Sequence, residues 1–344
     1  RSTLFPYTTL FRSTNLLGLL YLLILAGGIL AFRVGRFAIS PGTLAEIVLS
    51  RLGMAAPNGD PTLETVVLNV RLPRILLAIL TGGALSAAGA SYQTLFKNPM
   101  VSPDLLGVSA GAGFGAALAM LNNLAWWQVQ VSAFAFGSLA VLMASAIGYA
   151  FARQEITVMV LGGIVVSSLF QALLSILKTM ADTDNVLPSI TFWLMGSLGR
   201  GSNHDVLVLL PFLAVSLLLL FLFRYSINAL AAGNEEAAAL GVNVGLVKAV
   251  VILASTLMTV VSVSICGIVG WVGMVVPHIA RLLVGADYSR LLATSFGVGA
   301  LFLLGMDTIV RGVPGVELPL GVLTALVGTP IFVVLLSRVR KGWL

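Results

Sequence analysis

Charged side chains are scarce in this 344-residue sequence, which contains 13 Asp and Glu and 19 Lys and Arg. They make up only 9% of the residues, whereas a typical soluble domain contains about 25%. Hydrophobic residues reach 58%, and the mean hydropathy is +1.05. A chain so poor in charge cannot cover its surface with polar groups. Its outer surface must therefore face an apolar medium, which predicts an integral membrane protein.

Cysteine and histidine are nearly absent as well. The single cysteine, Cys266, excludes a disulfide framework, and its apolar surroundings predict a buried, hydrophobic role. His278 has no second ligand at a metal-binding spacing, so we expect no metal site in this chain. The net charge of +6 does not indicate nucleic-acid binding, because the Lys and Arg residues are scattered and form no basic run.

The motifs of several enzyme classes are also missing. There is no HExxH, GxSxG or paired intramembrane carboxylate to support a protease or esterase, and no GxxxxGK[ST] P-loop to hold ATP. A charge at a helix centre costs about 2.5–3.5 kcal/mol, which ion-driven carriers usually accept in order to build a relay. The apolar segments here contain almost no such charge. We therefore expect no enzyme activity and an energy source on a partner; the alternative, an ion-coupled secondary transporter, would need Asp307 as its relay.

Long apolar segments predict an all-α fold with about ten transmembrane helices, since a spanning helix needs about 20 apolar residues. The boundary between the seventh and eighth is weakly marked, because no charged residue occurs from Ala249 to Ala280 and only Gly267, Gly270 and Gly273 indicate a turn. Nine or eleven helices therefore remain open. The predicted ranges are 15–32, 74–96, 104–121, 130–152, 156–180, 205–223, 246–266, 268–284, 290–309 and 319–337.

The remaining segments are connections and one terminal piece. Residues 1–13 are too short and polar to span and lack the regions of a signal peptide, which indicates a non-native or disordered leader before a single transmembrane domain over 14–344. Residues 33–73 end in an amphipathic piece, and 181–204 contain a short helix at the interface. Residues 224–245 form the most polar internal loop, with helical propensity.

The distribution of Lys and Arg bears on orientation. An even number of helices puts both termini on one side, with nine Lys and Arg residues there and eight on the other when residues 1–13 are left out. Five of those eight fall in one long loop, and long loops count less in the positive-inside rule. The balance favours cytoplasmic termini.

Three arginines stand out on the side opposite the termini. Arg71 and Arg74 flank a proline ahead of the second helix, and Arg311 lies one turn after Asp307. They are either ordinary interfacial arginines, with Asp307 and Arg311 as an i,i+4 pair, or a cationic docking site for carboxylates of a soluble partner. Composition alone favours the first interpretation.

Several motifs, in order, resemble the permeases of ATP-binding-cassette (ABC) importers for iron siderophores, haem and cobalamin, known as the FecCD family. The resemblance extends from about residue 15 to the C-terminus. It is carried by RLPR (71–74), GGALSAAGASYQTLFKNPMVSPDLLGVSAGAG (82–113), FWLMGSLGR (192–200), LGVNV (240–244), VGMVVPHIARLLVGADYSRLL (272–292) and ELPLGVLTALVGTPIF (317–332).

The resemblance implies a type II ABC importer permease fold in a bacterial or archaeal cytoplasmic (inner) membrane, with cytoplasmic termini. It implies a homodimer or a pair of homologous permeases, two cytoplasmic ATPase subunits that bind ATP and Mg, and a periplasmic or lipid-anchored binding protein. This chain would bind no cofactor itself and no nucleic acid. The expected cargo is a metal chelate, with ferric siderophore first and haem, cobalamin or molybdate still open.

The resemblance also implies roles for individual residues. Arg71, Arg74 and Arg311 match arginines that pair with glutamates on the binding protein, which reverses the preference from composition. Residues 228–243 match two coupling helices that contact the ATPase, through Asn228, Ala232, Gly233, Glu235, Glu236, Leu240 and Gly241. The cytoplasmic gate corresponds to Asn98, Met100, Ile156 and Thr157, where Ile156 departs from a more polar pattern. The 190–200 segment matches a short helix near the external gate.

Overall fold

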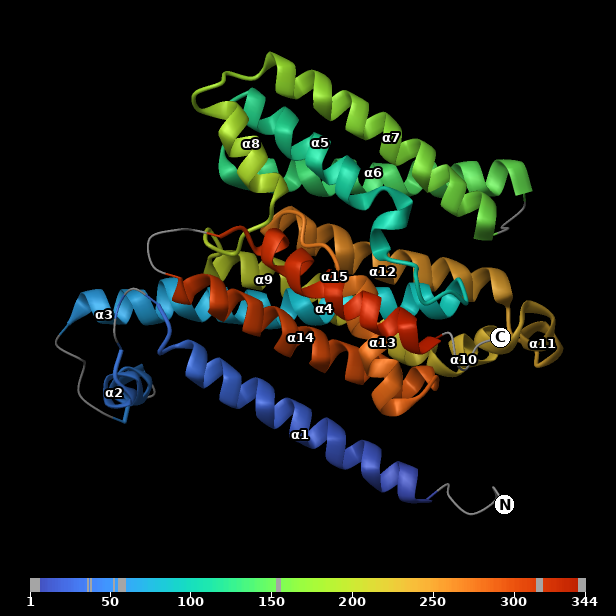
Figure 1. Cartoon of the computed structure of the whole chain (residues 1–344), viewed down its shortest axis with the longest axis horizontal. Helices are drawn as coiled ribbons and strands as arrows, with labels where there is room; N and C mark the ends of the chain where they lie inside the picture. The colour runs from blue at the N-terminus through green and yellow to red at the C-terminus, as the bar shows by residue number, and fades with distance from the viewer. Residues whose placement is uncertain are drawn as a thin grey trace.

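The computed structural model describes residues 7–339 except 36, 38, 52, 55–59, 153–155 and 314–317. Within these ranges the chain is helical and contains no strand (Figure 1). Ten apolar helices make up its body: α1 (Tyr7–Ala31), α4 (Leu72–Leu95), α5 (Val108–Leu121), α6 (Trp126–Ala152), α7 (Ile156–Met180), α9 (Asn203–Leu222), α12 (Val244–Cys266), α13 (Val272–Val284), α14 (Tyr288–Gly312) and α15 (Leu320–Val339).

Most of these helices have the apolar length that a bilayer requires. Six segments in the described part of the chain are long and apolar enough to span a membrane, and four further apolar helices are shorter. Their ranges agree with the ten predicted ones to within a few residues at most ends. The predicted all-α membrane fold is confirmed. Helix α1 begins at Tyr7, so its first turns lie in the segment predicted as a leader, of which residues 1–6 fall outside the described ranges.

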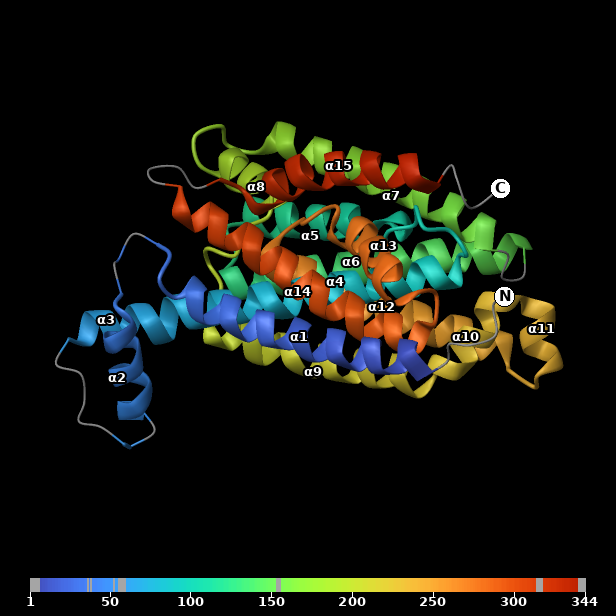
Figure 2. The same ribbon diagram turned by 60° about the horizontal axis from the view of Figure 1, so that its bottom comes forward.

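Short helices gather at the two ends of the bundle (Figures 1 and 2). Helix α1 starts, and helix α15 finishes, on the side of the bundle that carries α10 and α11. An even number of membrane crossings requires the two termini to lie on one side. The short elements are α2 (Pro41–Arg51), α3 (Pro61–Thr65), the π-helical η1 (Val66–Arg71) and α8 (Val186–Leu194) at one end, and α10 (Arg224–Ala232) and α11 (Asn234–Ala239) at the other, with the 3₁₀ turn η2 (Pro103–Leu106) before α5.

Helix α4 lies at the centre of the bundle, and small residues let its neighbours approach closely. The most apolar stretch of the Pro61–Leu95 segment is 83% buried. A Cβ on Gly82 would overlap the carbonyl of Gly299 in α14, and a Cβ on Gly89 would overlap the carbonyl of Gly273 in α13. Such backbone contacts between small residues are how apolar helices associate where lipid removes the hydrophobic driving force.

Helices α5, α6 and α7 form a layer of their own beside the central helices (Figure 1). Gly111 and Gly115 of α5 contact the backbone of α6, where a Cβ would meet the carbonyls of Phe136 and Ser132. Gly107 precedes α5 in a left-handed conformation with φ of 86°. In the 107–115 stretch, Gly111 and Gly115 therefore allow close packing of α5 against α6, and Gly107 forms the turn before α5.

The break between α12 and α13 lies at residues 267–271, as the glycines predicted. Gly267 and Trp271 both adopt positive φ, of 71° and 70°, which ends one helix and starts the next. The amide of Ser197 donates to the carbonyl of Cys266 at 2.8 Å, and a Cβ on Gly321 would overlap the carbonyl of Ile268. This non-helical backbone is therefore enclosed by the segment after α8 and the start of α15, which is the condition for tolerating it at membrane depth.

The contact of α4 with α13 gives the first testable prediction. Replacement of Gly89 by Ala puts a methyl group against the carbonyl of Gly273, so we expect a loss of about 1–3 kcal/mol of stability from overpacking. The matched control is Gly305→Ala in α14, where an added Cβ meets no atom within 4 Å. Thermal unfolding of the two purified variants in detergent measures the difference. Equal melting temperatures would contradict the proposed backbone contact.

Candidate functional site

At the end of the bundle that carries α2, α3 and α8, two arginines hold one carboxylate, and a third arginine lies beside them. Asp307 in α14 is fully buried. Its Oδ1 accepts a hydrogen bond from Nε of Arg74 at 2.8 Å, and its Oδ2 lies 2.9 Å from Nε of Arg311 in an ion pair outside hydrogen-bond geometry. Residues 307 and 311 are neighbours on one helix face, whereas Arg74 comes from α4. The predicted i,i+4 pair is thus confirmed and extended by a third member.

Two of the arginines also hold the chain that leaves α1. The guanidinium of Arg71 donates to the carbonyls of Phe32 and Phe37. The guanidinium of Arg311 donates to the carbonyls of Ala31 at 3.0 Å and Val34 at 3.4 Å. Carbonyls at a helix C-terminus have no partner within the helix, so cationic donors stabilise them well. Arg71 and Arg311 therefore have a structural task that the sequence did not reveal.

The cluster keeps an excess of positive charge. Three arginines and one aspartate sum to +2, because three positive charges minus one negative charge leave two. All three arginines line a hollow of about 250 Å³, together with Ser197 and Gly199. Arg74 is the most accessible, with 18% of its side chain exposed against 8% for Arg311. The predicted docking arginines are thus brought together, and their surplus charge faces a hollow that an acidic group can enter.

At the opposite end, α10 and α11 carry the predicted coupling residues. Ile227, Leu230 and Ala237 are buried in the same hydrophobic cluster as residues of α4, α12 and α14. Asn228 connects α10 to the start of α14. Its amide nitrogen donates to Asp287 at 2.9 Å, and its carbonyl oxygen accepts from the backbone amide of Tyr288 at 2.7 Å. The pair of short helices is therefore fixed to the start of α14.

The outer surface of the two helices is exposed. Ala232, Glu235 and Glu236 face outward, and Leu240 is 73% exposed although it is a large apolar residue. Gly241 follows with φ of 78°, a left-handed conformation that glycine adopts without strain. Gly233 separates the helices, and a Cβ on it would overlap the carboxylate of Glu236. An exposed leucine beside two carboxylates at the tip of an anchored helix pair is suited to contact another protein.

The Asp287 carboxylate has a perturbed acidity. Its partial burial acts to raise its pKa, but hydrogen bonds from Asn228 and Ser289 and the charge of Arg290 outweigh burial and lower the pKa. A carboxyl whose folded pKa is lowered contributes stability above its ordinary pKa of about 3.9, and this contribution is lost as the pH falls through the lower folded value. The link between α10 and α14 is therefore intact at neutral pH.

The predicted gate residues lie in two segments. Asn98 and Met100 are exposed in the loop after α4, where Oδ1 of Asn98 accepts from the amide of Met100 at 2.9 Å. Ile156 and Thr157 begin α7, and their side chains lie outside the described part of the chain. The gate assignment stays a prediction.

One partly buried acidic residue, Asp104, is not among the predicted site residues. Asp104 in η2 accepts a hydrogen bond from the hydroxyl of Ser109. It lines a cavity of about 220 Å³ together with Thr259 and Trp271, next to the break between α12 and α13. The sequence contains a sign of this turn, because Pro103 and Asp104 interrupt an apolar region. The predicted range 104–121 places Asp104 at the start of a spanning helix, whereas α5 begins at Val108.

The ten apolar helices, the broken pair α12–α13 and the two different ends define a membrane permease, and comparison with known proteins identifies its family. The model of the FecCD transport family matches residues 22–338. The chain is 35% identical to the molybdate import system permease protein MolB of Haemophilus influenzae over 95% of this chain and 96% of that protein. It is 37% identical to the hemin transport system permease protein HmuU of Yersinia pestis, over 80% and 84% of the two chains.

A solved structure agrees with this result. An ABC transporter described as of the metal-chelate type, in an inward-facing conformation, superimposes with a TM-score of 0.84 at 33% identity, over 94% of this chain and 99% of the other. The chain belongs to the FecCD transport family and is an ABC transporter permease. The resemblance drawn from the sequence motifs is confirmed.

The arrangement around Asp307 gives a second prediction. Asp307→Asn leaves Arg74 and Arg311 beside each other without a counter-charge, so we expect a loss of about 3 kcal/mol of stability, typical of breaking a buried ion pair. The control is Asp184→Asn, which removes an exposed carboxylate at the same end of the molecule. Thermal unfolding in detergent provides the measurement. An unchanged melting temperature for the Asp307 variant would refute a structural role for the ion pair.

Proposed function

We propose that this chain is the membrane-spanning subunit of an ATP-driven importer that moves a metal chelate into the cytoplasm. The observation that carries the proposal is the different chemistry of its two ends: a cationic hollow at one and an anchored, exposed helix pair at the other. We further propose that two copies of the chain, or two homologous permeases, form one pathway in the inner membrane. The end with α10 and α11 then faces the cytoplasm.

The cationic hollow supports the docking of a substrate-binding protein. Arg71, Arg74 and Arg311 line it with a net charge of +2 after Asp307 is counted. Glutamates of a partner lobe can enter such a hollow, because charge-assisted Arg–carboxylate pairs guide encounter and set register while remaining releasable. The hydrogen bonds of Arg71 and Arg311 to the chain after α1 keep the receiving surface in shape before the partner arrives.

The helix pair supports coupling to separate ATPase subunits, which would hold ATP and Mg. Leu240, Glu235 and Glu236 offer an exposed surface, while Ile227, Leu230 and the Asn228–Asp287 hydrogen bond attach the pair to the bundle. A push on α10 and α11 by closing ATPase subunits would therefore act on α14 directly. In the same scheme Asn98, Met100, Ile156 and Thr157 form the inner gate.

The cargo is proposed at the level of a chemical class. The named relatives carry molybdate and haemin, and others of similar identity are described as permeases for iron chelatin and cobalamin. We propose a metal chelate, with ferric siderophore first and haem, cobalamin or molybdate as the alternatives. Uptake assays of labelled cargo with the cognate binding protein decide between them.

The alternative function is an ion-coupled secondary transporter. It would need Asp307 to exchange ions with a water-filled cavity, but this carboxylate is held between two arginines. Reconstitution distinguishes the two functions. The importer requires ATPase subunits and ATP for uptake into proteoliposomes, whereas uptake by the chain alone under an ion gradient would overturn the proposal.

Arg74 provides the sharpest test of docking. Arg74→Gln removes one positive charge from the hollow, leaves Arg311 as the counter-charge of Asp307, and puts an amide donor in place of the guanidinium. We expect binding-protein association to weaken by about 1 kcal/mol, roughly fivefold, with the larger effect at low salt. The charge-matched control is Lys178→Gln, in the last turn of α7, at the same end of the molecule as Arg74. Equal affinity of the Arg74 variant and the parent at low salt would remove the docking assignment.

Leu240 provides the test of coupling. Leu240→Ser deletes the apolar contact at the tip of the helix pair without disturbing the buried anchors. We expect uptake to fall about tenfold while ATP hydrolysis by the assembled complex continues, because a contact of this size contributes on the order of 1–2 kcal/mol. The control is Met54→Ser, equally exposed at the opposite end, at 75% against 73%. Full uptake by the Leu240 variant would contradict the coupling role.

A further inference from the structure

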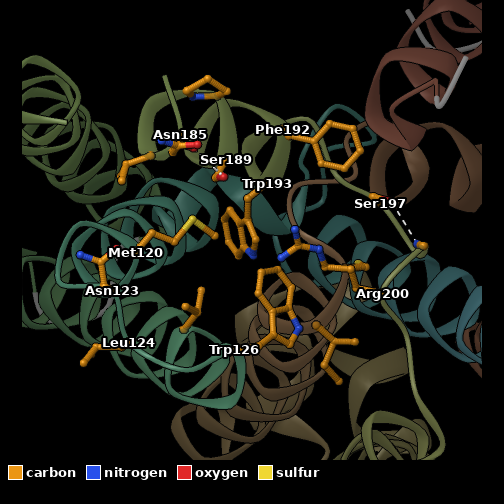
Figure 3. Close-up of a pocket in the computed structure, with 16 residues that line it drawn as sticks. Met120, Asn123, Leu124, Trp126, Asn185, Ser189, Phe192, Trp193, Ser197 and Arg200 are labelled. Atoms are coloured by element: carbon orange, nitrogen blue, oxygen red, sulfur yellow. Dashed lines mark hydrogen bonds between the residues drawn. The ribbon is translucent and has the colours of Figure 1, made fainter. Parts of the chain in front are cut away.

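A large cavity opens at the same end of the molecule as the cationic hollow, and the 190–200 segment, predicted to lie near the external gate, forms part of its lining. Its volume is about 850 Å³. The walls come from the end of α5, the start of α6, α8 and the end of α12, with the 197–200 segment closing one side (Figure 3). Cavities of about 300–1,000 Å³ are the usual size for small-molecule sites.

The cavity has a buried apolar floor and a polar rim. Val129, Ile265 and Cys266 are buried at its base. Met120 and Phe192 add apolar surface to the walls. The rim carries exposed amides and hydroxyls, contributed by Asn123, Asn185 and Ser189. This arrangement offers apolar contact at the base and hydrogen-bonding groups at the rim.

Among the described residues, Arg200 is the only charged one on the lining, and none of them provides it with a counter-ion. Its guanidinium carbon lies 4.5 Å from the centre of the Trp126 ring, a cation–π contact that fixes the charge at the cavity. None of the carboxylates in the described ranges pairs with it, and no acidic side chain lines the cavity. The site is therefore electropositive, with a donor fork suited to carboxylate or catecholate oxygens.

Trp193 adds an unsatisfied donor. Only 5% of this residue is exposed, yet its indole N–H finds no hydrogen-bond partner among the described residues. The ring projects from α8 into the cavity toward Trp126 and Arg200, as Figure 3 shows. A buried N–H without an acceptor is unfavourable, so a ligand oxygen that reaches it when a covering side chain shifts would form a favourable hydrogen bond.

We propose that this cavity binds an anionic aromatic group of the transported chelate, of the catecholate or aromatic carboxylate class. The ring would stack among the indoles of Trp126 and Trp193, while its oxygens accept from Arg200 and the Trp193 N–H. A small tetrahedral oxyanion would meet the same donors but leave the apolar walls uncovered. The inference rests on the proposed import function and narrows its cargo to an aromatic chelate.

The experiment is a binding measurement on the purified full-length chain in detergent, without ATPase or binding protein. Equilibrium dialysis with the iron(III) complex of 2,3-dihydroxybenzoate measures affinity independently of tryptophan fluorescence. We expect saturable binding that Arg200→Gln weakens by about tenfold and Trp193→Phe by about fivefold, since one charged and one neutral hydrogen bond are lost. Arg200 is exposed, so its replacement leaves the core intact. Arg200→Lys keeps the charge without the fork and should restore part of the affinity.

Two residues at the same end of the molecule that do not line the cavity provide matched controls. Trp127→Phe alters an exposed indole beside Trp126 that does not line the cavity, and Lys178→Gln removes a cation elsewhere at this end. Both should bind as the parent does. Cyclohexanecarboxylate and molybdate should compete weakly, because the first lacks the aromatic ring and the second lacks both ring and apolar surface.

Three outcomes would overturn the inference: no saturable binding of the complex, affinity unchanged in both Arg200→Gln and Trp193→Phe, or competition by molybdate as strong as by free 2,3-dihydroxybenzoate. The last would make the cavity a general oxyanion site. None of these three outcomes contradicts the proposed import function, provided that uptake still requires ATP and the partner subunits. Conversely, uptake without ATP would remove the import proposal while the binding result stands on its own.

Discussion

The backbone contact between α4 and its neighbours α13 and α14 is the constraint on which the rest of the molecule depends. Glycine at positions 82, 89, 273 and 299 removes the side chains that would hold these helices apart. With α4 enclosed at the centre, its N-terminal end brings Arg74 to Asp307, and its C-terminal end delivers the loop with Asn98. Both ends of the permease are therefore positioned by one buried helix. In lipid, where apolar surface alone gives no reason for two helices to meet, this close packing supplies the specificity.

Helix α14 joins the two ends in a second way. At its start, Asp287 and the amide of Tyr288 hold Asn228 of the coupling pair; five turns later, Asp307 and Arg311 belong to the arginine cluster. A helix of this length without an internal proline is a stiff rod, so a displacement of α10 would reach the opposite end as a tilt or shift of α14. The same rod contacts α4 through Gly299. The architecture thus offers a mechanical route between the surface proposed for the ATPase and the surface proposed for the binding protein.

Much of the fold could be predicted from the sequence, because the bilayer demands long apolar helices and each is visible as a local run. The turn after Cys266 was also visible in its glycines. Contacts between distant residues were not: Arg74 and Asp307 are 233 positions apart, and the group of Trp126, Trp193 and Arg200 comes from three separate elements. The structural task of Arg71 was hidden for a related reason, since its partners are backbone carbonyls, which have no signature in the sequence. The role of the arginines in docking and of the 228–243 segment in coupling came from family resemblance and stays a prediction.

The source of energy follows from the same electrostatics. A carboxylate that relays protons must pass between charged and neutral forms at little cost, but neutralising Asp307 would leave two guanidinium groups facing each other in a buried site. Asp104, which is partly buried, lines a small cavity at the helix break and accepts a hydrogen bond from Ser109. Neither residue belongs to a chain of titratable groups crossing the described bundle. In the proposed importer the work on the cargo enters through a surface, and the anchored pair α10–α11 with its exposed leucine is the surface that we propose for it.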